Sequence, residues 1–350
     1  MFNKYQIRHS DGTPLKGEKY FVLRLDSDNP EEAARVRAAM EAYKGESLPE
    51  VADTSAPKKF EVTDIIINEG KKRFGGIPLY RIRALKDIPR HNVKAGDLGG
   101  WVQSEKNLSQ DGDCWIEGDS VVICNAHISG DALVYDKAVI RGCARITGEA
   151  KVGENAYVAD SAFVTDRVSI LESAQIFGEV GISGTAIIGG HAHISGRAMV
   201  FGGAIVSGDA LIFGAAHISG QAFVSGSARV SEKARIRGNA RVVADCAIRG
   251  NAIIGGGVGI LDNVVIAGNA EVNSAYDFRC IRDTWDKGAI ITYTRSNKRW
   301  QVKSFHGTGE ELIAWGYKES ELAGKSYKAL VECFTALDAA IEESKCAPKN

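Results

Sequence analysis

The sequence predicts a mainly β protein whose central part is a parallel β-helix of about nine coils. Starting at Ile116, every sixth residue through Val272 is Ile or Val, which makes 27 consecutive matches without an insertion. Four residues after these positions, 20 of 26 residues are Ala, and two residues after them 17 of 27 are Gly. A repeat of this regularity indicates a solenoid. Three six-residue sides close one 18-residue coil, so the 27 units predict nine coils.

Each position of the six-residue unit has a physical reason. The β-branched residue favours a short strand and fills the core, and its two neighbours point outward because side chains alternate along a strand. Ala leaves room where the chain turns, and Gly suits a corner with positive φ or a close backbone approach. Residues 18 apart therefore stack on neighbouring coils. The unit predicts a three-sided prism with an aliphatic core.

The unit resembles the hexapeptide repeat of left-handed β-helix proteins, and the resemblance covers residues 114–275. The segment GDLGGWVQSEKNLSQDGDCWI (residues 96–116) is similar to the corresponding segment of YdcK-like proteins of enterobacteria and prophages, a family of the transferase type. The resemblance implies a left-handed helix. It also implies a possible coenzyme-A-dependent acyltransferase, in which a histidine acts as general base near a groove between rods, commonly in a trimer.

The flanking regions divide the chain further. We expect a small α/β unit over 1–45, a polar linker over 46–59 and a β-rich segment over 60–113 that caps the open end of the repeat, which occupies 114–275. Residues 276–350 are predicted to form a hairpin followed by helices and to cover the far end of the rod. Caps are needed because a solenoid with open ends can pair end to end.

Three patterns support the capping regions. Leu79–Ala84 alternates as a strand does, and Ala289–Tyr293 with Trp300–Lys303 flanks a polar turn. Thr308 and Glu311 have the spacing of a helix capping box. One face of a second helix is predicted to carry Tyr327, Leu330, Val331, Phe334, Leu337 and Ile341.

Composition narrows the class of protein. The 43 basic and 44 acidic residues nearly cancel, which does not favour a nucleic-acid partner. Seven cysteines without a C-x-x-C pair do not predict a disulfide framework or a metal site, and they fit a reducing cytoplasm. No 18-residue apolar run occurs, so neither a membrane span nor a signal peptide is expected.

The middle coils are unusually apolar on the outside. Residues 168–228 contain four charged side chains, where the chain average of 25% predicts about fifteen. Ile187, Ile205 and Phe223 are 18 apart and should stack on one face. Such a surface indicates a subunit or partner interface, although one of the terminal domains could instead cover it. The predicted interface residues are Phe177, Ile187, Met199, Phe201, Ile205, Leu211, Phe213 and Phe223.

A run of arginines follows in the last coils. Such a set could bind a phosphate, the nucleotide of coenzyme A, nucleic acid or an acidic protein, or it could be a solvated surface paired with Glu232 and Asp245. No aromatic residues are interleaved with it, which disfavours single-stranded nucleic acid. The predicted anion- or partner-binding residues are Arg229, Arg235, Arg237, Arg241 and Arg249.

The histidines give the alternative enzyme hypothesis its candidate bases. His127, His193 and His217 each precede a core residue and should point outward, while His191 lies at a corner. Neutral imidazole could act as a base near pH 7. However, the repeat has no inserted loop, and we expect no carboxylate beside a histidine to orient it. A surface or interface role is therefore favoured over catalysis.

Three functions follow from these patterns. The first is a non-enzymatic interaction or scaffold protein that needs no cofactor and binds both itself, as a homo-oligomer, and a protein partner. By analogy it is phage- or prophage-encoded, and its partner is then a host protein in defence or regulation. The second is an acyltransferase that uses acetyl-coenzyme A, and the third is a structural rod of a phage particle. The first hypothesis is preferred because the apolar middle coils favour binding, whereas the histidines lack the setting of a catalytic base.

Overall fold

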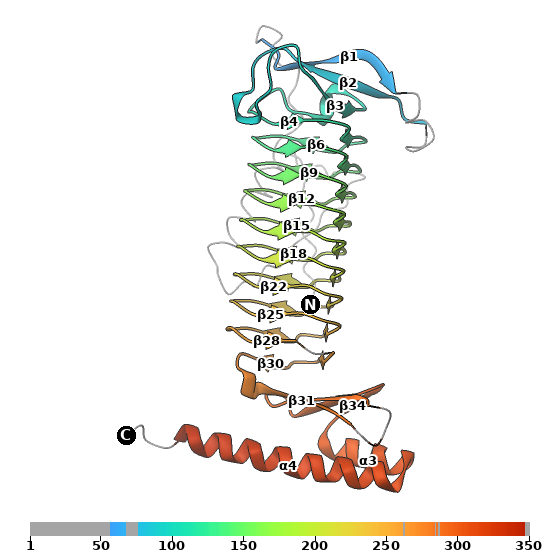
Figure 1. Ribbon diagram of the computed structural model, residues 1–350, viewed down its shortest axis with the longest axis vertical. Coiled ribbons are helices and arrows are strands. Elements are labelled where there is room, and N and C mark those ends of the chain that lie inside the picture. Colours follow the sequence, from blue (N-terminus) through green and yellow to red (C-terminus); the bar gives the residue numbers. More distant parts are fainter. Residues whose placement is uncertain (1–56, 68–75, 262, 284, 286–287, 347–350) are drawn as a thin grey trace, which may run out of the picture. The chain divides into compact units, whose positions relative to one another are not determined.

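The computed structural model describes residues 57–67, 76–261, 263–283, 285 and 288–346. The chain divides into two units, Met1–Ala56 and Pro57–Asn350. The α/β unit expected over 1–45 and most of the predicted linker lie outside the described residues. The second unit contains a parallel β-solenoid with a small β cap at one end and a four-stranded antiparallel sheet with two helices at the other (Figure 1).

The solenoid has three faces, each of which is a column of two-residue parallel strands. The β4 face consists of β4 (Trp115–Ile116), β7 (Leu133–Val134), β10 (Lys151–Val152), β13 (Ser169–Ile170), β16 (Ile187–Ile188), β19 (Ile205–Val206), β22 (Phe223–Val224), β25 (Arg241–Val242) and β28 (Gly259–Ile260). The β5 face consists of β5 (Val121–Val122), β8 (Val139–Ile140), β11 (Tyr157–Val158), β14 (Gln175–Ile176), β17 (His193–Ile194), β20 (Leu211–Ile212), β23 (Arg229–Val230), β26 (Ala247–Ile248) and β29 (Val265–Ile266). The β6 face consists of β6 (His127–Ile128), β9 (Arg145–Ile146), β12 (Phe163–Val164), β15 (Gly181–Ile182), β18 (Met199–Val200), β21 (His217–Ile218), β24 (Arg235–Ile236), β27 (Ile253–Ile254) and β30 (Glu271–Val272).

The predicted roles of the repeat positions are confirmed. The aliphatic residue of each unit is buried in one continuous core, and the Ala four residues later is buried with it. Residues 18 apart pair between coils in register, as Ile187 does with Ile205 and Ile205 with Phe223. The corner glycines have positive φ, for example 72° at Gly142, where an added Cβ would lie 2.7 Å from the backbone nitrogen of Asp160 on the next coil. Gly is therefore required there by both conformation and space.

Nine coils are confirmed, and part of a tenth precedes them. Strand β3 (Leu98–Val102) continues the β5 face, because Trp101 and Val102 pair in parallel with Val121 and Val122. Leu108 then forms a parallel bridge to Ile128 on the next side. This partial coil escaped the sequence analysis because it lacks the six-residue period.

Acidic residues replace Gly at several corners and form a second kind of contact. Asp160, Asp166 and Glu172 occupy the three successive corners of one coil, all with left-handed backbone (φ 58–61°). Their carboxylates accept hydrogen bonds from the backbone N–H of Gly178, Gly184 and Gly190 on the next coil, at 2.9 Å for Asp160 and 2.8 Å for Asp166. Asp tolerates this conformation better than most residues, and its side chain satisfies an otherwise unpaired donor.

The segment before the repeat closes one end of the core. Strands β1 (Phe60–Ile67) and β2 (Leu79–Ala84) join β3 in an antiparallel arrangement, and two short 3-10 helices follow, η1 (Pro89–His91) and η2 (Glu105–Asn107). The predicted strand Leu79–Ala84 is thus confirmed. Phe60, Ile82 and Ile88 are fully buried and belong to the solenoid core. The segment therefore acts as the predicted cap.

A buried lysine anchors this cap. Lys59, placed at the end of the polar linker by its sequence, is 0% exposed. Its Nζ donates to the carbonyl oxygens of Asp111 (3.3 Å), Gly112 (3.2 Å) and Cys114 (3.0 Å) and lies 3.1 Å from the Cys114 Sγ. Burial raises the pKa of the Cys114 thiol, although the nearby Lys59 opposes this. The ammonium thus ties the start of β1 to the backbone of the segment that leads into the first repeat.

The other end of the rod is covered by the C-terminal domain. The 3-10 helix η3 (Ala275–Asp277) leads into β31 (Phe278–Arg282), β32 (Ile290–Thr294), β33 (Arg299–Val302), β34 (Phe305–Gly307), α3 (Gly309–Glu319) and α4 (Glu321–Cys346). The predicted hairpin is the β32–β33 pair, and the Thr308–Glu311 capping box begins α3 as expected. Phe278, Cys280 and Ile290 pack against the solenoid core.

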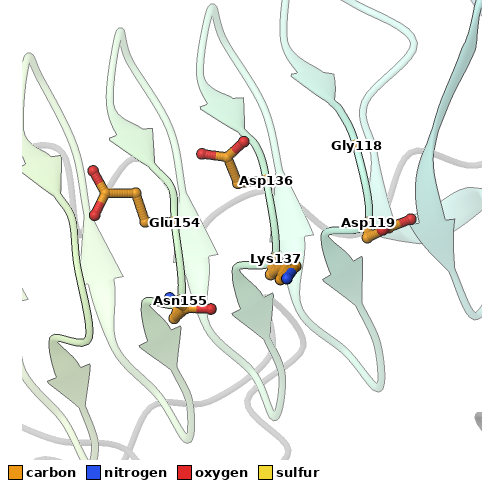
Figure 2. A pocket seen from close by; sticks show the side chains of 6 residues that line it. All are labelled: Gly118, Asp119, Asp136, Lys137, Glu154 and Asn155. Atoms are coloured by element: carbon orange, nitrogen blue, oxygen red, sulfur yellow. The ribbon is translucent and has the colours of Figure 1, made fainter.

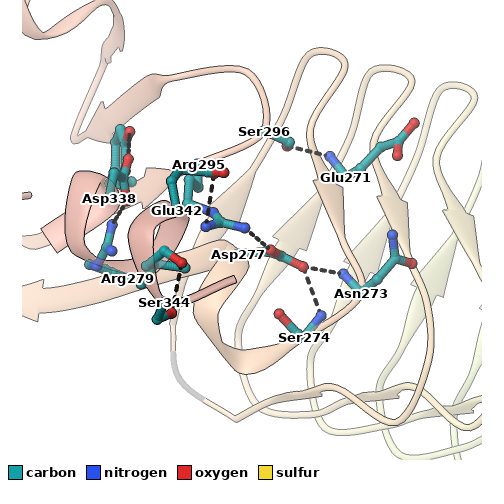
Figure 3. A network of polar contacts seen from close by, with 12 residues as sticks. Glu271, Asn273, Ser274, Asp277, Arg279, Arg295, Ser296, Asp338, Glu342 and Ser344 are labelled. Atoms are coloured by element: carbon teal, nitrogen blue, oxygen red, sulfur yellow. Dashed lines mark hydrogen bonds and ion pairs between the residues drawn. The ribbon is translucent and has the colours of Figure 1, made fainter. Parts of the chain in front are cut away.

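An ionic network joins α4 to the sheet and to the last coil (Figure 3). Arg279 lies 2.6 Å from Asp338, which also accepts a hydrogen bond from the Tyr293 hydroxyl. Arg295 lies 3.2 Å from Asp277, whose carboxylate accepts backbone hydrogen bonds at the end of the rod. Burial and the bond to Asp338 raise the pKa of Tyr293.

Helix α4 buries most of the predicted face. Tyr327 and Phe334 are buried, and Leu330, Val331 and Ile341 are half-buried, whereas Leu337 is 45% exposed. The prediction is therefore wrong at Leu337. The neighbouring Asp338 is directed toward the sheet by Arg279 and Tyr293, and this polar contact takes the place of an apolar one.

Candidate functional site

The predicted interface residues lie on three different faces of the solenoid. Ile187, Ile205 and Phe223 stack on the β4 face, as the 18-residue spacing predicts. Ile187 is 42% exposed, and the other two are half-buried. Leu171 and Val243, which follow core residues on the same face, are also half-buried. The β4 face therefore carries an apolar strip in which Ile187, Ile205 and Phe223 form a continuous column. Leu171 and Val243 lie near its two ends in the neighbouring column, where Gly189, Ser207 and Ser225 stand between them.

A second apolar strip, with stacked rings, lies on the β5 face. The Phe177 ring lies between Tyr157 and His193, with centroid distances of 5.3 and 5.2 Å. Leu211 pairs with His193 on the next coil, and Phe213 is 41% exposed. Because Phe177 and His193 stack on each other, one face of each ring is already occupied by a neighbour. This arrangement does not favour stacking of nucleic-acid bases on these rings.

The remaining two predicted interface residues are on the β6 face. Met199 is 3% exposed and Phe201 is 8% exposed. Both side chains are directed away from the solenoid core, as predicted, but both are buried. They therefore add nothing to the exposed apolar surface, which lies on the other two faces.

The five arginines are also distributed around the rod. Arg229 and Arg249 are on the β5 face, Arg235 and Arg237 on the β6 face and Arg241 on the β4 face. Each six-residue step moves the chain to the next face, so neighbours in the sequence become separated in space. The Arg241 guanidinium lies 5.0 Å from the centre of the Phe223 ring, and Arg249 lies 3.5 Å from the Gln301 side chain. The structure does not bring the five together in one anion site.

The four candidate histidines differ in their surroundings. The Nδ1 of His127 lies 2.8 Å from the Lys106 carbonyl oxygen, and His193 is stacked on Phe177. His217 pairs with Met199 on one side and Arg235 on the other, as the spacing predicts.

His191 is an exception to the sequence analysis. Its Nδ1 lies 3.7 Å from the Asp209 carboxylate on the next coil, so the expectation that no carboxylate lies beside a histidine is wrong. The 18-residue spacing could have revealed this pair. Both side chains are more than 70% exposed, and the distance exceeds that of a hydrogen bond. The pair lacks the fixed orientation that a catalytic dyad requires.

A groove that the sequence analysis missed lies at the corner between the β4 and β5 faces (Figure 2). Its volume is about 450 Å³, and it is open to solvent. The lining residues stack in two rows along the corner, and they are Gly118, Asp119, Asp136, Lys137, Glu154 and Asn155. Three carboxylates and one ammonium disfavour an anionic ligand such as coenzyme A, and no candidate histidine lines the groove.

Metal-binding clusters and membrane-spanning helices are also absent from the described residues. No group of three or more His, Cys, Asp or Glu side chains in this part of the chain is placed to hold a metal ion. Within the same ranges, no helix has the length and apolar character needed to cross a membrane. The comparisons with known proteins add no assignment: no protein-family model matches the chain, and no curated protein matches it.

Proposed function

We propose that this chain is a non-enzymatic interaction or scaffold protein that acts through the surface of its β-solenoid. The observation that carries this proposal is the exposed apolar strip on the β4 face, with Ile187 42% exposed among stacked apolar neighbours. Exposed apolar surface of this extent is typical of a binding surface. Phe213 on the β5 face, 41% exposed, extends the argument to a second face.

The arrangement of polar residues supports the same proposal. An acyltransferase needs an oriented base beside a pocket that accepts an anionic cofactor. Here the histidine with a neighbouring carboxylate is exposed and loosely placed, and the groove at the β4–β5 corner is acidic. The rigid solenoid with capped ends instead suits a scaffold that presents side chains at fixed spacing. The similarity to prophage proteins suggests a host protein as partner.

Calorimetric titration with acetyl-coenzyme A tests the proposal against the enzyme alternative. We expect no saturable heat up to millimolar ligand. Saturable binding that is lost in the Arg235→Ala, Arg237→Ala double variant, but kept in Arg249→Ala, would replace the proposal with a cofactor site on the β6 face.

Affinity capture from the native host tests the binding role directly. We expect a protein captured by the wild type to be lost with Ile187→Ser or Phe213→Ser. It should be retained with Gln175→Ser, which changes an exposed polar side chain on the β5 face. Equal capture by all three variants would contradict binding through the apolar strips.

The acyltransferase remains the second candidate function because of one observation, the His191–Asp209 pair. In that case His191 would be the general base, and a demonstrated activity would be abolished by His191→Ala and reduced by Asp209→Asn.

A further inference from the structure

Charge is distributed unevenly along the solenoid. Residues 111–172 contain eleven acidic and five basic side chains, a net charge of −6, whereas residues 229–249 contain two acidic and six basic ones, a net charge of +4. Between them the middle coils are almost uncharged. Two such rods side by side attract each other when they run in opposite directions and repel when they run in the same direction.

The apolar strip of the β4 face is also arranged nearly symmetrically about Ile205. Ile187 lies one coil before it and Phe223 one coil after it. Two coils away, Leu171 is matched by Val243. A two-fold contact between identical chains requires a surface that is similar in both directions from its centre.

We propose that the β4 face binds a second copy of this chain in antiparallel orientation, with the two-fold axis at Ile205. This inference rests on the proposed function and names the partner of the β4 face. In this arrangement Ile205 lies against Ile205 of the partner subunit, and Ile187 lies against Phe223 of the partner subunit. Apolar side chains then meet apolar side chains in the column of Ile205, and Ser207 meets Ser207 of the partner subunit in the neighbouring column.

The ends of the strip fit the same arrangement. Arg241 is opposite Ser169 of the partner subunit, on the coil that also carries Asp166, instead of meeting its own copy as it would between parallel rods. Leu261 is opposite Gly153 of the partner subunit. Its side chain is 64% exposed, more than any other large apolar side chain described on the solenoid. The Tyr135 ring occupies the space beside Gly153, where an added Cβ would lie 2.0 Å from the Tyr135 Cζ. Leu261 therefore meets an aromatic ring.

The strip is narrow, which sets the expected affinity. From Gly153 to Leu261 it presents two outward positions per coil over seven coils, or about 29 Å at ~4.8 Å per coil. Such a face is smaller than that of an obligate dimer, so we expect a dissociation constant on the order of micromolar. Sedimentation velocity of the full chain should show a shift from monomer to dimer between about 1 and 100 μM.

Disulfide trapping tests the orientation. In a background with the exposed Cys143 and Cys333 replaced by Ser, the Ile205→Cys variant should form a cross-linked dimer under mild oxidation. An equimolar mixture of Ile187→Cys and size-tagged Phe223→Cys should form the mixed dimer. Ile187→Cys alone should not, because its two copies would be offset by two coils, about 10 Å, beyond the reach of a disulfide.

A charge at the centre of the strip tests the contact by itself. Ile205→Asp should abolish the dimer, while Phe213→Asp on the β5 face should leave it unchanged, with circular dichroism confirming that both variants fold. A protein that stays monomeric to 100 μM, or that cross-links through Ile187→Cys alone, would overturn the inference. Neither result touches the wider interaction role, which is decided by the acetyl-coenzyme A titration and the capture experiment.

Discussion

Substitution of Asp166 separates two contributions to the stability of a solenoid corner. Asp166 has a φ of 61°, and its carboxylate accepts a 2.8 Å hydrogen bond from the Gly184 N–H on the next coil. Ala cannot accept this bond, which is worth about 1 kcal/mol, and it is strained in the left-handed region by about 1 kcal/mol. We therefore expect Asp166→Ala to lower the free energy of unfolding by about 2 kcal/mol.

Two further variants divide this loss. Asp166→Gly loses the hydrogen bond but adopts the left-handed backbone without strain, so its loss should be about 1 kcal/mol. Asp166→Asn keeps both an acceptor and a tolerance of this conformation, so its loss should be below about 0.5 kcal/mol. Urea unfolding, followed by circular dichroism, measures the free energy of unfolding of the three variants. The Ala variant should be the most destabilised, the Gly variant the next and the Asn variant the least.

Asp136 is a matched control for the strain. Its φ is 56°, and among the described residues it makes no corresponding bond to Glu154 on the next coil. Asp136→Ala should therefore lose about 1 kcal/mol, from strain alone. Hydrogen exchange at the Gly184 amide should speed up in Asp166→Ala and Asp166→Gly but not in Asp136→Ala. An unchanged Gly184 rate, or equal losses for Ala and Gly at position 166, would refute the reasoning.

Two other predictions concern the ends of the rod. Lys59→Met should destabilise the cap by about 3 kcal/mol, because it removes the hydrogen bonds of a buried ammonium to three backbone carbonyl oxygens. Amide exchange in β1 measures this loss, and Lys58→Met, at an exposed position, is the control. Equal effects of the two substitutions would contradict the role of Lys59. Although burial opposes it, backbone hydrogen bonds and Arg295 hold the pKa of Asp277 below its usual 3.8. A carboxyl whose pKa is lower in the folded chain than in the unfolded chain stabilises the fold when the pH is above its pKa in the unfolded chain. This stabilisation is lost as the pH falls through its pKa in the folded chain. Below pH ~4 the free energy of unfolding should therefore fall less steeply with decreasing pH in Asp277→Asn than in the wild type. Identical pH profiles of the two proteins would contradict this.

The pattern of the repeat was sufficient to predict the solenoid and its register. A β-branched residue every six positions leaves one way to bury the core, and the 18-residue coil then places Ile187, Ile205 and Phe223 in one stack. The hairpin and the capping box of the C-terminal domain were equally readable, because turn residues and N-cap spacing act locally.

Much of the candidate site was not predictable in this way. The five arginines are close in the sequence yet lie on three faces, because each six-residue step turns the chain to the next side. The corner groove and the His191–Asp209 pair combine residues from neighbouring coils at positions outside the aliphatic pattern. Inspection of every 18-residue pair would have found both.

The sequence by itself determined the coil, its core and the partners of each residue on neighbouring coils, because an invariant short period leaves no freedom in the register. The tertiary structure decided which outward side chains are exposed. Met199 is buried and Ile187 is not, although both precede a core residue in the same repeat. The caps show the same effect: Lys59 reads as part of a polar linker, but the backbone carbonyls of a segment fifty residues away hold it in the interior.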